Sequence, residues 1–166
     1  MSSQRVFNVL FICTRNSSRS IMAESILNGM KHPQFRAFSA GSNPKGEISS
    51  NALNLLRENR LPTEGLRSKD WDEFSRPDAP ALDFVFTVCD KAAGEVCPVW
   101  PGQPMTAHWG VEEPTQANAT DEATRRKFLE VASILRRRIE LFVSLPIEKL
   151  DRLALQKSLQ EIGQSR

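Results

Sequence analysis

The chain has 166 residues, of which 40% are hydrophobic and 25% charged, and its 22 basic and 20 acidic residues leave a net charge of +2. This size and composition are typical of one soluble globular domain and exclude a disordered or fibrous protein. The near balance of charge provides no global field for nucleic acid or for an anionic membrane surface, so any preference for anions must be local.

The N-terminus has a basic residue before an apolar run, as a signal peptide would. The run is short, however, contains Asn8 and lacks a small-residue cleavage site, and no stretch approaches about 18 apolar residues. We therefore expect a cytoplasmic protein without a membrane span. In a reducing compartment, three cysteines argue against a structural disulfide framework and leave metal binding, redox chemistry or plain burial.

The first half of the chain alternates predicted strands and helices. Residues 6–12 are almost continuously apolar, as expected for a strand buried on both faces of a parallel sheet. Apolar residues then recur at helical spacing over residues 22–30, and residues 35–39 predict a second strand. A second helix is expected to begin at Ser49 or Ser50, and residues 68–74 are expected to form a short one.

The second half begins with another strongly apolar run, residues 82–88, which predicts a strand that ends at Cys89. Residues 98–114 carry four prolines and two tryptophans, which predicts a loop with at most a short strand at residues 105–108. Thr120 is expected to cap a long amphipathic helix. We place the arginine run 136–138 of that helix on a solvated face rather than against nucleic acid.

Strands that alternate with helices predict an α/β fold, a three-layer sandwich around a parallel sheet. We expect one domain over residues 1–145 and a C-terminal helical extension over residues 146–166. The extension could pack, fray or pair with a second copy, so the expected state is a monomer or a weak homodimer.

A polar segment between the first predicted strand and helix carries the candidate chemistry. Cys13 and Arg19 flank five residues there, and the amides of such a turn can bind an oxyanion with help from the helix dipole. Arg19 supplies a bidentate fork. The predicted oxyanion-binding residues are Thr14, Arg15, Asn16, Ser17, Ser18, Arg19 and Ser20.

The same positive potential is expected to lower the pKa of Cys13, and the Ser20 hydroxyl could donate to its thiolate. Cys13 is then a nucleophile. The competing interpretation is a buried cysteine that ends a strand near an exposed Arg19; the strand, the helix and the hydroxyl-rich interior of the segment favour the catalytic one.

Four segments of the chain resemble the low-molecular-weight phosphotyrosine phosphatase superfamily and, within it, the arsenate reductases of the same fold. They are VLFICTRNSSRSIMAE (9–24), FSAGSNP (38–44), FTVCDKAAGEVCPVWPG (86–102) and HWGVEEP (108–114). The resemblance implies a four-stranded parallel sheet in flavodoxin-like order. It also implies Cys13 as nucleophile, Arg19 as oxyanion clamp, and Asn16 and Ser20 as residues that shape the loop.

Phosphate and arsenate are nearly isosteric, so a loop that binds one also admits the other. The two activities differ in the chemistry that follows attack by the thiol. A phosphocysteine is released by water, whereas an arseno-thiol adduct is reduced when a second thiol attacks the first, so extra thiols favour reduction. Cys89 is expected at the same sheet edge as Cys13, and Cys97 follows after a polar segment that could be a short mobile helix. The competing interpretation is that Cys89 and Cys97 are inert small hydrophobic residues.

The segment around Cys89 resembles the redox segment of thioredoxin-linked arsenate reductases. This resemblance implies that Cys89 attacks Cys13, that arsenite leaves, and that Cys97 then attacks Cys89 to form a disulfide for an external reductant. Some of these relatives have a cysteine where this chain has Ser18. Because that cysteine is absent here, glutathione with glutaredoxin remains an alternative to thioredoxin. No bound cofactor is expected, and no metal, since four ligands at recognised spacings are missing.

The usual general acid of the superfamily is an aspartate followed by proline, and the matching place holds Glu113 before Pro114. Glu113 could protonate a leaving oxygen or be a solvated carboxylate. The chain has no tyrosine to line a phosphotyrosyl pocket, and Trp100 and Trp109 are more typical of packing anchors. Arsenate reduction is therefore favoured; the alternatives are a phosphotyrosine phosphatase that uses a phosphocysteine intermediate, and a non-enzymatic redox or oxyanion sensor.

Overall fold

The computed structural model describes residues 5–89, 100–115 and 118–165. Cys97 and the predicted short helix before it lie outside these ranges. The elements in chain order are β1 (Phe7–Cys13), α1 (Arg19–Gly29), β2 (Phe35–Gly41), α2 (Ser50–Glu58), the 3-10 helix η1 (Trp71–Phe74), β3 (Phe84–Thr87), β4 (Met105–His108), α4 (Asp121–Val143), the 3-10 helix η2 (Ile147–Lys149) and α5 (Arg152–Ile162).

The four strands form one parallel sheet in the order β2-β1-β3-β4, which confirms the flavodoxin-like order. The central strand β1 pairs with β2 on one side and β3 on the other, with Cys13 opposite Gly41 and Ile12 opposite Thr87. All strands therefore end at one edge of the sheet, where an α/β fold binds its ligands.

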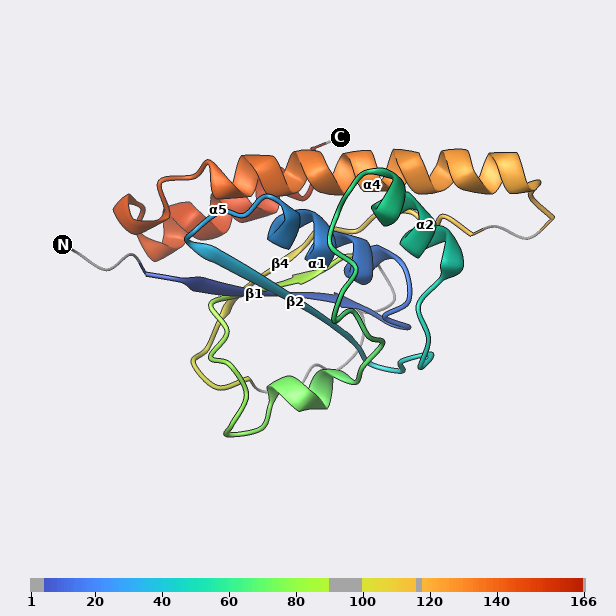
Figure 1. Ribbon diagram of the computed structural model, residues 1–166. Coiled ribbons are helices and arrows are strands. Elements are labelled where there is room, and N and C mark those ends of the chain that lie inside the picture. Colours follow the sequence, from blue (N-terminus) through green and yellow to red (C-terminus); the bar gives the residue numbers. More distant parts are fainter. Residues whose placement is uncertain (1–4, 90–99, 116–117, 166) are drawn as a thin grey trace.

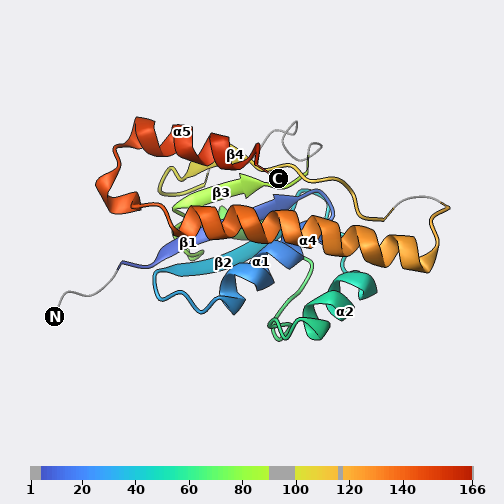
Figure 2. The ribbon, with the colours of Figure 1, turned by 90° about the horizontal axis from the view of Figure 1, so that it is seen from above.

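The layers confirm the predicted α/β class. Helices α1, α2, α4 and α5 lie on one face of the sheet, and η1 with its flanking segments lies on the other (Figure 1). Seen from above, the long helix α4 crosses the sheet beside α1, and α5 lies over β4 (Figure 2). Among the described residues, η1 and connecting chain cover this second face.

The core forms where β1 meets the helix layer. Four consecutive residues of β1, from Val9 to Ile12, are fully buried, as the apolar run predicts for a strand covered on both faces. On α4, Phe142 inserts its ring among the rings of Phe35, Phe84 and Phe86. Burying each such side chain contributes about 1.5–3 kcal/mol, which fixes the helix over the strands that carry the site.

Two predicted helix starts are confirmed. The hydroxyl oxygens of Ser49 and Thr120 accept hydrogen bonds from the amides of Ala52 and Ala123, at 3.4 and 3.1 Å. The short helix expected over residues 68–74 is present only as η1, because the preceding backbone is extended: Gly41 N donates to Lys69 O at 2.9 Å.

One prediction about α4 is wrong. Arg138 was placed on a solvated face, yet only 4% of it is exposed, and its guanidinium donates to the carbonyls of Trp109, Gly110 and Ser165. The reason is helical spacing: Arg138 lies three residues after Leu135 and four before Phe142, both fully buried. Its neighbours Arg136 and Arg137 are exposed, as expected.

The C-terminal helix α5 packs onto the domain: Leu155, Leu159 and Ile162 are buried. The boundary predicted at residue 146 stays a prediction.

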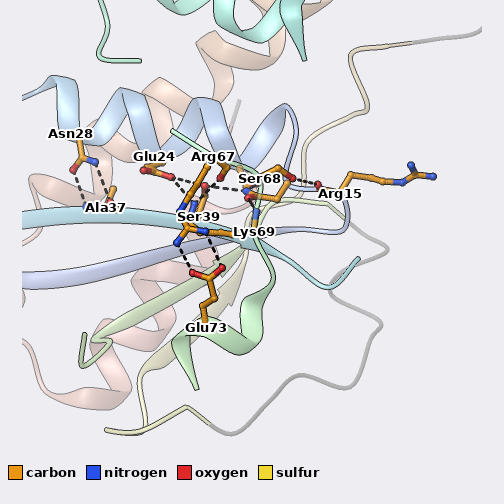
Figure 3. Close-up of polar contacts among 11 residues, drawn as sticks. Arg15, Glu24, Asn28, Ala37, Ser39, Arg67, Ser68, Lys69 and Glu73 are labelled. Carbon is orange, nitrogen blue, oxygen red and sulfur yellow. Dashed lines mark hydrogen bonds and ion pairs between the residues drawn. The ribbon is translucent and has the colours of Figure 1, made fainter. Parts of the chain in front are cut away.

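Side-chain amides bond to both outer strands of the sheet. Gln156 donates to Thr106 O of β4 at 2.8 Å, and Asn28 bonds to both backbone groups of Ala37 in β2 (Figure 3). Within the described ranges, no helix has the length and apolar character needed to span a bilayer.

Candidate active site

The segment that joins Cys13 to α1 is a loop whose carbonyls face outward. The backbone amides of Asn43, Lys45 and Ser49 donate to the carbonyls of Thr14, Arg15 and Ser17, each at 2.9 Å. In a planar trans peptide the N–H points opposite to the C=O, so the amides that follow these carbonyls face inward. The loop therefore presents amides at the N-terminus of α1, which is the geometry that binds an oxyanion.

Asn16 holds the loop in shape. It is fully buried with a positive φ of 49°, and its side-chain nitrogen donates to Ser20 Oγ at 2.8 Å and to Ser39 Oγ at 3.0 Å. Its oxygen accepts from Lys69 N at 2.9 Å. Every hydrogen bond therefore ties the loop to α1, β2 or the segment before η1, which agrees with the shaping role that the resemblance implies for Asn16 and Ser20.

A buried charge pair supports this network from behind. The Ser39 hydroxyl donates to Glu24 Oε1 at 2.6 Å, and Lys69 Nζ lies 3.8 Å from the same oxygen (Figure 3). Burial raises the pKa of Glu24 and lowers that of Lys69, and each charge partly offsets the shift of the other. Sequence reasoning missed this pair because nothing local connects positions 24 and 69.

Gly41 is a second residue that sequence reasoning missed. A Cβ built on it would lie 2.5 Å from the Thr14 carbonyl oxygen and 2.9 Å from that of Cys13. Only glycine allows β2 to approach the loop this closely. The available signal was its place inside the matched segment FSAGSNP.

Arg19 lies at the mouth of the loop with a guanidinium that is only partly engaged. Its Nη1 donates to Val111 O at 3.0 Å and its Nη2 to Glu113 Oε2 at 2.9 Å. Its Nε is buried and has no hydrogen-bond partner within the described residues. A buried donor without an acceptor costs about 1–3 kcal/mol, so this N–H favours a bound oxygen. The geometry fits the predicted clamp.

The structure brings Cys89 to Cys13. Both are buried free thiols, 2% and 3% exposed, and their side chains are hydrogen-bonded to each other. The Thr14 amide donates to Cys89 Sγ at 3.3 Å, and the Thr14 hydroxyl oxygen lies 3.6 Å from it. As predicted, two neighbouring parallel strands place two sulfur atoms at one sheet edge.

Comparison with known proteins then identifies the family. Residues 8–157 match the family described as low molecular weight phosphotyrosine protein phosphatase. The chain belongs to this family.

Proteins named arsenate reductases are similar to this chain in sequence and in fold. An arsenate reductase of Oceanobacillus iheyensis is 31% identical over 134 residues, which are 81% of this chain and 93% of that protein. The arsenate reductase of Archaeoglobus fulgidus has a TM-score of 0.59 at 28% identity, over 80% of this chain and 98% of that one. A thioredoxin-dependent arsenate reductase of Corynebacterium glutamicum has a TM-score of 0.59 at 25% identity, over 89% and 66%. The predictions of an enzyme and of this fold are confirmed.

The pKa of the Cys13 thiol is shifted in the direction opposite to the sequence expectation. The hydrogen bond to Cys89 raises the pKa of the Cys13 thiol, burial raises it further, and Arg19 and the Arg15 amide lower it by less. The expectation of a thiol ionised near neutral pH counted Arg19 and the amides and left out the neighbouring thiol. Cys89 and burial therefore oppose the ionisation of Cys13, whereas Arg19 and the Arg15 amide favour it.

The other loop residues occupy less central positions. Ser18 is the N-cap residue of α1, and Ser17 contributes its carbonyl to Ser49. The Arg15 side chain is exposed and extends away from the site, while its carbonyl also accepts from Ser68 Oγ at 3.2 Å (Figure 3).

Glu113 joins this phosphatase-like site through its contact with Arg19. Its side chain is 52% exposed, and its second oxygen accepts from Thr115 N at 3.2 Å. The preceding Glu112 instead pairs with Lys127 at 2.6 Å. Of the two adjacent glutamates, Glu113 is therefore the one placed to exchange a proton with a bound anion. Its role as general acid stays a prediction.

The tryptophans are packing residues. Trp109 is fully buried and stacks on Phe86 with ring centroids 3.8 Å apart, and Trp100 is 6% exposed and packs edge-on against Trp71. Neither ring lies free at a pocket rim. Among the residues that the structure describes, no three histidine, cysteine or acidic side chains gather in a way that could hold a metal ion.

Proposed function

We propose that this enzyme reduces arsenate to arsenite, with Cys13 as the nucleophile and Cys89 as the second thiol. The observation that carries the proposal is the hydrogen-bonded contact between these two side chains. Hydrolysis of a phosphocysteine needs only water, whereas reduction of an arseno-thiol adduct needs a second sulfur within reach of the first. The relatives named arsenate reductases support the choice of substrate.

Binding begins at the loop. The inward amides, the N-terminus of α1 and the unused Nε of Arg19 offer hydrogen bonds to the oxygens of a tetrahedral dianion. An oxygen of the bound dianion accepts the Cys13 proton, so Cys13 reacts as the thiolate. A sulfur–arsenic bond forms and one oxygen leaves as water, with Glu113 as the proposed proton donor.

Reduction follows at the neighbouring sulfur. The Cys89 thiolate attacks Sγ of Cys13, the sulfur–arsenic bond breaks, and its electron pair stays on arsenic, which passes from As(V) to As(III). Arsenite leaves and a Cys13–Cys89 disulfide remains. The Thr14 amide, 3.3 Å from Cys89 Sγ, stabilises the attacking thiolate.

The last exchange is proposed from the resemblance, because Cys97 lies outside the described residues. Its thiolate attacks Cys89, which frees the Cys13 thiolate and leaves a Cys89–Cys97 disulfide. An external thiol system, thioredoxin or glutathione with glutaredoxin, then supplies two electrons. The proposed enzyme holds no cofactor of its own and works in the cytoplasm, where such thiols are kept reduced.

A phosphotyrosine phosphatase is the second candidate, because the family description names that activity. The loop admits phosphate as well as arsenate. Recognition of a phosphotyrosyl ring needs exposed aromatic residues at the pocket, whereas this chain has no tyrosine and buries Trp100 and Trp109. A sensor that binds oxyanions without turnover is the non-enzymatic alternative.

The test compares arsenate-dependent NADPH oxidation, coupled through either thiol system, with hydrolysis of p-nitrophenyl phosphate. We expect arsenate turnover in the wild type and its loss in Cys13→Ser, Cys89→Ser and Cys97→Ser. Hydrolysis should be lost only in Cys13→Ser, which makes it the internal control for folding. Full arsenate turnover in Cys89→Ser would overturn the proposal, and hydrolysis without any arsenate turnover in the wild type would favour the phosphatase.

Thiol mapping by mass spectrometry tests the order of the exchanges. After a single turnover without reductant, the wild type should carry a Cys89–Cys97 disulfide. In Cys97→Ser the relay should stop one step earlier, with Cys13 bonded to Cys89. A wild-type protein that keeps all three thiols after releasing arsenite would contradict the relay.

A further inference from the structure

A second loop, residues 109–113, supplies the acceptors of Arg19, and Arg138 donates hydrogen bonds to the backbone of this second loop. This guanidinium is 4% exposed and donates from Nη1 to Trp109 O at 2.8 Å and to Gly110 O at 3.1 Å. The next residue along the loop, Val111, accepts from Arg19 at 3.0 Å. A charged group buried in this way is costly unless its hydrogen bonds are made, so it ties together the segments that supply its acceptors.

The third acceptor comes from the chain just after α5. Arg138 Nε donates to Ser165 O at 3.0 Å, and the indole N–H of Trp109 donates to Leu159 O at 2.9 Å. A Cβ built on Gly163 would lie 2.4 Å from His108 O and 2.8 Å from Trp109 Cδ1. Because the φ of Gly163 is −62°, any residue could adopt its backbone; glycine is needed there for close packing.

We propose that Arg138 and the docked end of α5 are positioning elements for Arg19. They act through the backbone of residues 109–111 and touch neither the substrate nor the reacting sulfurs. The proposal deepens the proposed function and rests on the oxyanion site at Cys13. It assigns a role in anion binding to the C-terminal helix, whose residues the chemistry does not otherwise use.

The reason is the geometry of a planar fork. Val111 O and Glu113 take up Nη1 and Nη2 of Arg19, which fixes the direction in which Nε points. If the base of the loop shifts, both acceptors move and the fork rotates away from the anion. A displacement of about 1 Å at a clamp of this kind can cost on the order of 100-fold in rate.

The experiment uses the full chain with three variants: Arg138→Met removes the hydrogen bonds, Arg138→Lys keeps the charge without the fork, and Gly163→Ala wedges α5 away from the loop. The matched controls are Arg137→Met, an exposed neighbour on α4, and Gln160→Ala, an exposed residue of α5. The first readout is the phosphate concentration that protects Cys13 from iodoacetamide. The second is the arsenate KM and kcat.

We expect Arg138→Met and Gly163→Ala to weaken phosphate protection and to raise the arsenate KM, each about 10-fold, with a smaller change in kcat. Arg138→Lys should recover part of the loss, and alkylation without phosphate should stay within about twofold of the wild type. Combined with Arg19→Lys, Arg138→Met should add almost nothing, because it acts through Arg19. General destabilisation would not give this non-additivity.

Unchanged phosphate protection in folded Arg138→Met, or full additivity with Arg19→Lys, would overturn the proposal. Should Arg138→Met fail to fold by thermal unfolding, Arg138→Lys and Gly163→Ala decide in the same way. Phosphate protection needs no arsenate turnover. A wild type that binds phosphate but never releases arsenite therefore removes the proposed function and leaves the positioning role standing.

Discussion

The carboxylate of Glu113 contacts the guanidinium of Arg19 at 2.9 Å, although 94 residues separate them in the chain. The group proposed to bind the substrate anion is thus already paired with an internal anion. A dianion that binds at Nε and the carboxylate at Nη2 then share one guanidinium, and their like charges repel each other. The contact therefore holds the residue that we propose as the proton donor close to the substrate anion, at an electrostatic cost.

Replacing Glu113 with glutamine separates its two roles. Because a negative charge beside Arg19 is removed, phosphate protection of Cys13 should strengthen. The expected gain is about fivefold, which corresponds to roughly 1 kcal/mol, the repulsion between two unit charges about 4 Å apart in water. If Glu113 protonates the leaving oxygen, kcat should fall by about 100-fold or more. Glu112→Gln is the matched control. An unchanged kcat would show that Glu113 is not the acid.

The contact between the thiols makes a prediction about pH. The hydrogen bond between the Cys13 thiol and Cys89 is the largest cause that raises the pKa of Cys13, so Cys89→Ala should move the midpoint of Cys13 alkylation to lower pH. Reactivity near neutral pH should rise with it. Peptide mapping identifies the alkylated residue. Cys89→Ser keeps a hydrogen-bonding group and should shift the midpoint less; equal midpoints in wild type and Cys89→Ala would contradict the assignment.

Substitutions of Asn16 separate backbone strain from hydrogen bonding. Asn16→Ala removes three buried hydrogen bonds and keeps a positive φ, so we expect a loss of about 3 kcal/mol in the free energy of unfolding. Asn16→Gly loses the same hydrogen bonds but relieves the strain of the positive φ. It should therefore be more stable than Asn16→Ala by about 1 kcal/mol. Urea unfolding measures both, and phosphate protection should be lost in both. Identical stabilities would show that the positive φ carries no cost.

Removing Lys69 should make stability depend on pH. Lys69→Met takes from the largely buried Glu24 the cation paired with it, with an expected loss of about 3 kcal/mol at neutral pH. The pKa of Glu24 is already raised above 4.5 by burial and rises further without Lys69. The folded state then binds the proton more tightly than the unfolded one, so stability is greatest below pH 4.5 and falls as pH rises through the folded pKa.

Denaturant unfolding across pH checks this prediction. The double variant Glu24→Gln/Lys69→Met has no charge to bury, so it should regain most of the loss and show a flat profile. Lys45→Met, on a lysine whose side chain is half exposed, is the control. A pH-independent Lys69→Met would show that Glu24 does not titrate in this range.

The features that sequence could predict are those with a local cause. The apolar run of β1, the polar segment from Cys13 to Arg19 and the cap at Thr120 each depend on neighbouring residues, and each is present where the pattern indicates. Two parallel strands that end in cysteine also suffice to place Cys89 beside Cys13.

Contacts between residues far apart in the chain could not be predicted from the sequence. The sequence pattern places Arg138 among three surface arginines, whereas in the structure it donates to the carbonyls of Trp109, Gly110 and Ser165. The raised pKa of Cys13 has the same origin, since its main cause is Cys89, which lies just beyond the end of β3. A helical or strand period tells which face a residue occupies, but not which distant carbonyl or thiol meets it there.

The side-chain amides of Asn28 and Gln156 have a consequence beyond the active site. A sheet normally offers its outermost strands to any passing chain that can add a strand of its own, the route by which many proteins aggregate. Asn28 engages both backbone groups of Ala37 on one outer strand, and Gln156 engages Thr106 O on the other. Alanine at either position should leave catalysis intact and make concentrated solutions of the protein turn turbid sooner on warming.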